Sequence, residues 1–192
     1  NFREPINTLS HAIGFLLTIP GLIFLWKKSR KFSLCRLSLM IFIISMACCY
    51  AGSALFHGIN RSEKELEIYN QIDHAGIFLL IAGTYTPLVC NLMRSRWRWI
   101  ILFFAWFFCL IGAISCFYIG VMTPLMGTAF YLGLGWGAIF CYIEASNIHT
   151  RRRLFLLLLG GFLYSVGALI HLFKFPVFYP GVFGHHELFH LF

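Results

Sequence analysis

The last stretch of the chain carries residues whose types and spacing suit metal binding. His186 and His190 are four residues apart, so on a helix their imidazoles lie one above the other on one face. Two imidazoles at this spacing can bind one metal ion. Earlier in the chain, Ser53 and His57 are also four apart at the end of an apolar run, and Asp73, the one aspartate, follows shortly after. The pattern predicts a scaffold that gathers these polar residues at one point.

Three protein nitrogens and a water form the open coordination of a catalytic zinc. We therefore predict a Zn²⁺ site with His57, His186 and His190 as ligands, whose bound water ionises near neutral pH and becomes a nucleophile. Asp73 would hold that water or take its proton. Ser53, one turn below His57 on the same face, would bind a substrate carbonyl or support the metal site by hydrogen bonding. Ionisable residues inside apolar spans are costly and usually functional.

The segment from His186 to His190 also matches the HExxH signature of zinc metalloproteases, in which the glutamate is the general base. The two hypotheses share the metal pair and differ in the third ligand and the base. A protease needs Glu187, whereas the site described above needs Asp73 and tolerates a change of Glu187. Because the sequence shows no second protease motif, we favour the first hypothesis.

The other histidines have simpler interpretations, since a single histidine at the end of a span is more often an interfacial hydrogen-bonding residue than a ligand. His74 and His185 each adjoin a stronger candidate and point to another face, so we expect them beside the site or at the surface. His149 and His171 are expected near the basic face as ordinary loop or interface residues. His11 begins the first span, where packing and hydrogen bonding within the cluster both remain open.

The composition is that of an integral membrane protein. Of the 192 residues, 59% are hydrophobic and 11% charged, whereas soluble domains carry about 25% charged residues. The net charge of +8 falls in short clusters between apolar runs, as membrane topology places it, so we expect no nucleic-acid partner. The seven cysteines form no CxxC pair, which argues against a disulfide framework or a cysteine zinc site.

The apolar runs predict six spans and a shortened seventh. The six are expected at about 8–26, 37–57, 72–93, 99–118, 124–146 and 154–173. Residues 58–71 are expected as a surface loop or short interfacial helix. Pro87 should kink the third span, and Gly133 and Gly137 should allow close helix approach in the fifth.

The last segment begins near Gly181 and offers 12 residues. These span ~18 Å as a helix, short of the roughly 30 Å hydrocarbon core, so we expect the seventh helix to be truncated. The chain also starts at Asn1 without a methionine, and we expect both ends to be trimmed.

The distribution of the 15 lysines and arginines predicts an orientation. Eleven of them lie in the loops after the first, third and fifth spans, at positions 27, 28, 30, 31, 36, 94, 96, 98, 151, 152 and 153. The positive-inside rule then places the amino terminus outside the cytoplasm, on the same side as His57, Asp73 and His186.

Ordered motifs along the whole chain match a known family. They are Glu4-x-x-Asn7-x-x-Ser10-His11, Ser53-x-x-x-His57, Asp73-His74 with Ile81 to Pro87, Gly133-x-Gly135-Trp136, Gly160-Gly161-x-x-Tyr164-Ser165-x-Gly167 and Phe183-Gly184-x-His186-x-x-x-His190. The chain thereby resembles the hemolysin III-like branch of the progestin and adipoQ receptor (PAQR) family, related to the adiponectin receptors and, more distantly, to alkaline ceramidases.

This resemblance implies a seven-helix bundle around a zinc site. The histidine ligands of the family fall on His57, His186 and His190, and its serine and aspartate fall on Ser53 and Asp73. Glu187 falls at a position that the family varies. Adiponectin-receptor-like members keep the amino terminus in the cytoplasm, opposite to the orientation that the charge count predicts.

We therefore expect one all-α domain over residues 1–192, a seven-transmembrane-helix bundle enclosing zinc near one membrane face, in a bacterial-type plasma (inner) membrane. The leading hypothesis is a zinc-dependent hydrolase of a lipid amide or ester, with ceramide-like amides as the favoured substrate class. The lipid, ceramide-like or fatty-acyl, would lie in an intramembrane pocket lined by some of the 22 phenylalanines. The alternatives are a receptor or sensor with a structural zinc, and a membrane-damaging haemolysin, although no segment of the sequence looks pore-forming. The oligomeric state stays open.

Overall fold

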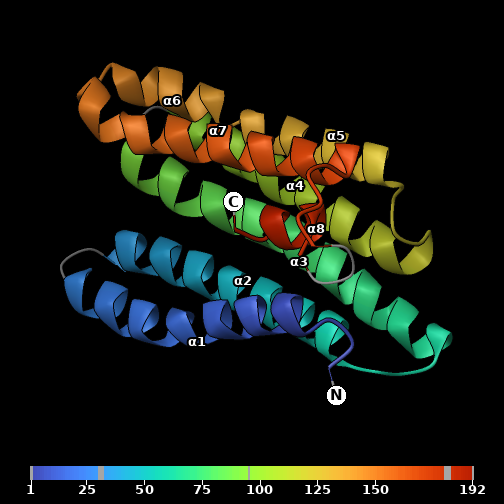
Figure 1. The fold of residues 1–192 in the computed structure, drawn as a ribbon. Helices are drawn as coiled ribbons and strands as arrows, with labels where there is room; N and C mark the ends of the chain where they lie inside the picture. The colour runs from blue at the N-terminus through green and yellow to red at the C-terminus, as the bar shows by residue number, and fades with distance from the viewer. Residues whose placement is uncertain (1, 30–32, 95, 180–182, 192) are drawn as a thin grey trace. The chain divides into compact units, whose positions relative to one another are not determined.

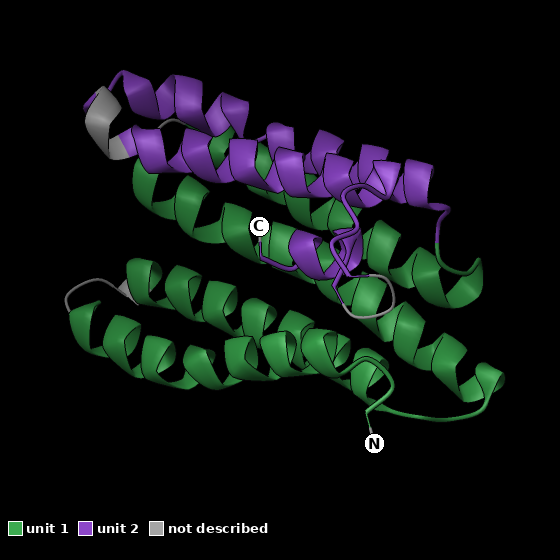
Figure 2. Cartoon of the chain, in the orientation of Figure 1, with its two compact units in different colours: residues 1–121 green, residues 122–192 purple. Residues whose placement is uncertain are grey.

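The computed structural model describes residues 2–29, 33–94, 96–179 and 183–191, and these are mainly helical (Figure 1). An isolated β-bridge joins Tyr179 and Phe183. Contacts divide the chain into two compact units, unit 1 over Asn1–Val121 and unit 2 over Met122–Phe192 (Figure 2). The expectation of one domain over residues 1–192 stays a prediction.

Unit 1 contains the four long helices α1 (Pro5–Lys28), α2 (Ser33–Gly58), α3 (Glu63–Leu92) and α4 (Trp97–Tyr118). Each helix packs against the next one in the sequence, α1 on α2, α2 on α3 and α3 on α4 (Figure 1). Pro5 suits the first turn of α1, where its missing N–H has no intrahelical partner to lose. At the other end, Lys27 and Lys28 lie in the last turn, where positive charge complements the helix dipole.

Helix α3 begins earlier than the sequence suggests. The Glu65 carboxylate accepts hydrogen bonds from the Ser62 backbone N–H at 3.2 Å and the Ser62 hydroxyl at 2.7 Å. These bonds start the helix at Glu63. Most of the hydrophilic stretch 58–71, which was expected to be a surface loop or a short interfacial helix, therefore forms the first turns of α3. The helix continues past Pro87 to Leu92, and the expected kink at that proline stays a prediction.

Small residues bring the helices of unit 1 close together. A Cβ atom on Gly83 would stand 2.6 Å from the Cβ of Ser45, and one on Gly76 would stand 3.0 Å from the Cα of Cys49. On the opposite side of α3, the fully buried Phe78 ring fills the space where Gly112 of α4 lacks a side chain. Glycine therefore sets how near α2 and α4 lie to α3.

Unit 2 contains α5 (Pro124–Trp136), α6 (Ile139–Ser146), α7 (Arg151–Phe173) and α8 (His185–Phe189). Helix α7 contacts each of the other three. The indole N–H of Trp136 donates a hydrogen bond to the Ser165 hydroxyl at 2.9 Å, which ties α5 to α7.

The fifth expected span is divided between α5 and α6. Around the break, the Ala138 N–H bonds the Gly135 carbonyl and the Phe140 N–H bonds the Gly137 carbonyl, both three residues back. Such bonds form a turn tighter than an α-helix, in a stretch rich in glycine, which is a weak helix former. The close helix approach expected at Gly133 is not seen within unit 2, where no described atom outside its own helix backbone lies within 4 Å of an added Cβ.

The membrane assignment is confirmed at the level of six spans. The segments of the described chain that are long and apolar enough to cross a membrane are Pro5–Lys28, Leu34–Gly58, Glu63–Leu92, Trp97–Tyr118, Pro124–Ser146 and Leu154–Phe173. After the sixth of these segments, the described residues include the five-residue helix α8. The expected start of the seventh helix at Gly181 lies outside the described residues, as do Arg30 and Lys31 of the charge count. The seven-helix count and the orientation stay predictions.

The contact between Gly83 and Ser45 leads to a prediction about stability. We expect Gly83→Ala to destabilise the protein by ~1–3 kcal/mol, because the added methyl group overlaps Ser45. The matched control is Gly160→Ala in α7, where no described atom outside the helix backbone lies within 4 Å of the new Cβ. Thermal unfolding of the purified proteins in detergent measures both changes, and a Gly83→Ala variant as stable as the control would contradict the packing described.

Candidate metal centre

His57 lies in the last turn of α2 and is only 1% exposed. Its Nδ1 atom lies 2.6 Å from Oε2 of Glu4, in the segment before α1. Its Nε2 atom lies 3.9 Å from Oδ2 of Asp73, on α3. The two ring nitrogens therefore face carboxylates that come from two different parts of unit 1.

Ser53 lies one turn before His57 on α2, and its side chain interacts with the Asp73 carboxylate. Both residues are buried, with 3% and 9% of their surfaces exposed. The structure thus brings together Ser53, His57 and Asp73, the three residues that the sequence proposes for this part of the site. A hydroxyl, an imidazole and a carboxylate that are buried close together are the types of group that take part in acid–base chemistry.

Glu4 also belongs to this cluster, although its sequence position did not mark it as a site residue. Besides facing His57, its carboxylate accepts a hydrogen bond from the Asn7 amide at 2.8 Å and forms an ion pair with Arg3 at 3.2 Å. The hydrogen bond with His57, together with the Asn7 amide and the Arg3 charge, lowers the pKa of Glu4 to about 2 against the opposing effect of burial. Glu4 is therefore ionised at neutral pH. The only signal in the sequence was the Glu4-x-x-Asn7 spacing in a polar lead-in.

Two further histidines lie around this cluster. The His11 ring lies parallel to that of His57, with centroids 6.0 Å apart and planes 10° apart, and also packs against Tyr50 at 5.9 Å. Ring packing is thus one role of His11. The His74 Nδ1 atom lies 3.0 Å from the carbonyl of Asn70, one turn earlier in α3. His74 is therefore anchored along its own helix, beside the cluster.

In unit 2, His186 and His190 lie on one side of α8, as their spacing predicts. Their ring centroids are 4.5 Å apart, and the His190 N–H bonds the His186 carbonyl at 3.2 Å. Between them in the sequence, Glu187 accepts a hydrogen bond from the Gly184 N–H at 2.8 Å. This carboxylate therefore has a structural role at the start of α8, where negative charge also complements the helix dipole.

The prediction for His171 was wrong. It was expected near the basic face, but it lies in the last turn of α7, at the opposite end from Arg151. Its ring centroid is 5.0 Å from that of His186 and 5.1 Å from that of Phe189. His171 is therefore a neighbour of the histidine pair. The signal was available, because residue 171 stands about one span length after the arginines.

Several of these side chains are of the types that bind metal ions. The described residues include possible metal ligands, namely Glu4, His11 and His57 in unit 1 and His186 and His190 in unit 2. A histidine that binds zinc through one ring nitrogen usually donates the other N–H to a carboxylate or carbonyl. His57 has this arrangement, since its Nδ1 meets the ionised carboxylate of Glu4.

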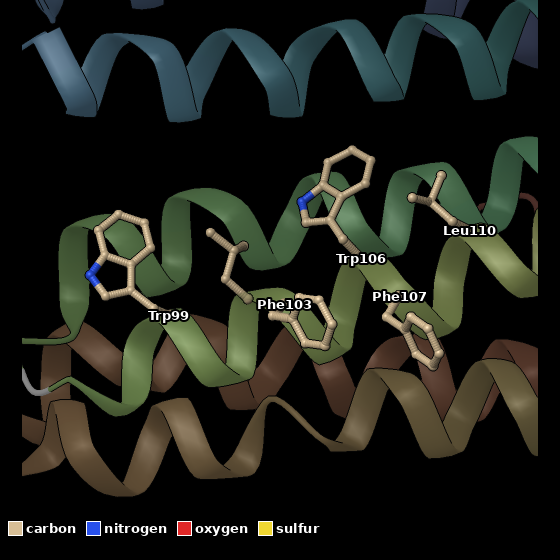
Figure 3. A pocket seen from close by; sticks show the side chains of 6 residues that line it. Trp99, Phe103, Trp106, Phe107 and Leu110 are labelled. Atoms are coloured by element: carbon tan, nitrogen blue, oxygen red, sulfur yellow. The ribbon is translucent and has the colours of Figure 1, made fainter.

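An apolar groove of about 420 Å³ runs along α4 in unit 1 (Figure 3). It is lined by Trp99, Leu102, Phe103, Trp106, Phe107 and Leu110. The Trp106 indole N–H donates a hydrogen bond to the Thr86 hydroxyl of α3 at 3.1 Å. Thr86 stands 13 residues after Asp73 on α3, ~20 Å along the helix. The groove is therefore separate from the cluster around His57.

Comparison with known proteins places the chain in a family. A family model described as haemolysin-III related matches residues 1–192. The chain is 33% identical over 192 residues to a Bacillus subtilis (strain 168) protein named Hemolysin-3 homolog, an alignment that covers 99% of this chain and 87% of the relative. It is 32% identical to Hemolysin-3 of Bacillus cereus, with 99% and 84% covered.

No solved structure gives a significant match to the chain. The full-length family match, the two relatives and the six apolar helices agree with one another. The protein is therefore a multi-pass membrane protein that belongs to the haemolysin-III-related family, a branch of the PAQR family.

Proposed function

We propose that this protein is a zinc-dependent integral-membrane hydrolase that cleaves an amide or ester bond in a lipid. The observation that carries the proposal is the buried contact of Ser53, His57 and Asp73 in unit 1. Burying a hydroxyl, an imidazole and a carboxylate among apolar helices costs free energy. Residues buried in this way are therefore usually functional. Ceramide-like amides are the substrates that we favour, with fatty-acyl esters as the next class.

The proposed zinc ligands are His57 from unit 1 and His186 and His190 from unit 2. A zinc ion held by these residues would supply a nucleophilic water and Lewis-acid activation of the substrate carbonyl. The separation of 3.9 Å between His57 Nε2 and Asp73 Oδ2 exceeds the length of a direct N–H···O hydrogen bond. His57 Nε2 and Asp73 Oδ2 are therefore neighbours without a direct hydrogen bond between these two atoms.

Asp73 would be the general base and then the general acid of this reaction. As a carboxylate it would take a proton from the attacking water, and as the acid it would return that proton to the leaving amine or alcohol. Ser53, which contacts Asp73, would orient the substrate carbonyl by hydrogen bonding. The lipid tails would enter an intramembrane pocket between the helices. Since the relatives come from Bacillus species, we also propose a location in the bacterial plasma membrane.

Metal content tests the site itself. We expect about one zinc per chain in purified wild-type protein, and a loss of that zinc in both His57→Ala and His190→Ala, because each variant removes one of three protein ligands. His149→Ala provides a matched control outside the proposed site. Elemental analysis of the purified proteins makes the measurement. Wild-type protein without metal would rule out the mechanism, and loss in only one variant would exclude a shared site.

Substitution of Asp73 tests the catalytic assignment. Asp73→Asn should keep zinc and lower the rate of lipid hydrolysis by ~10²–10⁴-fold, because the amide cannot carry the proton. Glu187→Gln should change the rate much less, whereas a protease-like site would lose activity with it. Release of fatty acid from ceramide and fatty-acyl ester substrates in detergent micelles measures the rates. In a receptor with a structural zinc, wild type and Asp73→Asn would both show no turnover while retaining the metal.

The names of the two Bacillus relatives favour a second candidate, a protein that damages membranes. Dye release from liposomes separates this candidate from the hydrolase. Under our proposal, protein stripped of zinc leaves liposomes of non-substrate phospholipid intact. Dye release by zinc-free wild type, at the same level as by His57→Ala, would support membrane damage that does not need the site.

A further inference from the structure

We propose that Glu4 is a positioning residue that holds His57 in the tautomer with its lone pair on Nε2, the nitrogen directed toward Asp73. The inference deepens the proposed function and rests on it for the identity of the metal. The segment before the first helix thereby acts on a residue at the end of the second.

The geometry selects one tautomer. Glu4 Oε2 lies 2.6 Å from His57 Nδ1, a short separation of the kind found in charge-assisted hydrogen bonds. An ionised carboxylate can only accept a hydrogen bond, so Nδ1 must carry the proton. A neutral imidazole then has its lone pair on Nε2. The neutral ring is also the form that binds a metal ion.

The Glu4 carboxylate is itself held in place. Asn7 bonds Oε2 at 2.8 Å, and Arg3 pairs with Oε1 at 3.2 Å, so both oxygens are engaged. The Arg3 guanidinium also lies 4.4 Å from the centroid of the Phe56 ring, next to His57 in the sequence. A carboxylate with these contacts has little freedom to rotate away from the imidazole.

The backbone of the same segment is bonded to the end of α2. The Glu4 N–H donates a hydrogen bond to the His57 carbonyl at 3.0 Å. The Thr8 hydroxyl bonds the Glu4 carbonyl at 2.7 Å, and a Cβ on Gly58 would stand 2.9 Å from Thr8 Cγ2. The start of α1 and the end of α2 are therefore in direct contact. Glu4 bonds both the side chain and the backbone of His57.

The experiment measures the tautomer and the affinity for zinc separately. In metal-free, full-length protein labelled with ¹⁵N-histidine, the His57 ring, assigned by comparison with His57→Ala, should show a protonated Nδ1 and an unprotonated Nε2. Glu4→Gln should lose this preference, because its amide can donate or accept. Its dissociation constant for zinc should rise about 10–100-fold, as for other partners of metal-bound histidines.

Three further variants distinguish a role of Glu4 in positioning His57 from a general role in stability. Glu4→Asp keeps a carboxylate and should keep the Nδ1–H tautomer, whereas Glu4→Ala should lose it. Glu63→Gln changes an exposed glutamate in the first turn of α3 and should leave both readouts unchanged. Thermal unfolding of the metal-free variants confirms that each is folded when its tautomer is measured.

The outcomes are distinct from those of the proposed function. Wild-type protein that binds no zinc overturns the proposed function and, with it, the metal-positioning role. Zinc bound equally well by wild type and Glu4→Gln overturns the role of Glu4 alone. A His57 ring protonated on Nε2 in the metal-free wild type also overturns it, whatever the zinc content.

Discussion

An ionisable side chain buried among apolar helices must find a partner, and His57 is the residue on which this constraint acts most strongly. It is 1% exposed at the end of α2 and faces two carboxylates, Glu4 from the segment before α1 and Asp73 from α3. A change in the position of either neighbouring helix would leave part of this group unpaired, at a cost of several kcal/mol. The positions of α1, α2 and α3 are therefore those that keep the His57 imidazole next to both carboxylates.

The packing of α2 against α3 meets this constraint through small residues. Contacts run from Asp73 near His57 to Gly76 at Cys49 and Gly83 at Ser45, so the numbers rise along α3 as they fall along α2. The two helices are thus antiparallel. Because glycine lets the backbones approach, the short side chain of Asp73 can reach the face of α2 that carries Ser53 and His57.

The sequence predicts the parts of the structure that depend on local pattern. Runs of apolar residues reveal the six long segments, and a spacing of four places Ser53 with His57. Long-range contacts are hidden from such reasoning, which is why the bond between Glu4 and His57 went unassigned. Composition also gives wrong boundaries for two helices. The hydrophilic residues after Ser62 form the first, capped turns of α3. The apolar run through Gly137 is interrupted by a tight turn between α5 and α6. Whether His57 shares a metal with His186 and His190 depends on how the two units combine, which no local pattern encodes.

The short helix α8 shows why a motif has to be interpreted together with its structure. A helix of five residues is unstable alone, so the geometry of His186 and His190 depends on what holds the segment. Glu187 bonds the backbone at Gly184, and the Phe189 ring packs between His171 and Tyr164 of α7. The glutamate that completes the protease-like signature thus has a structural contact at the start of this short helix. A metal bound by the two histidines would add to the same stabilisation, so metal binding and the order of α8 should be coupled.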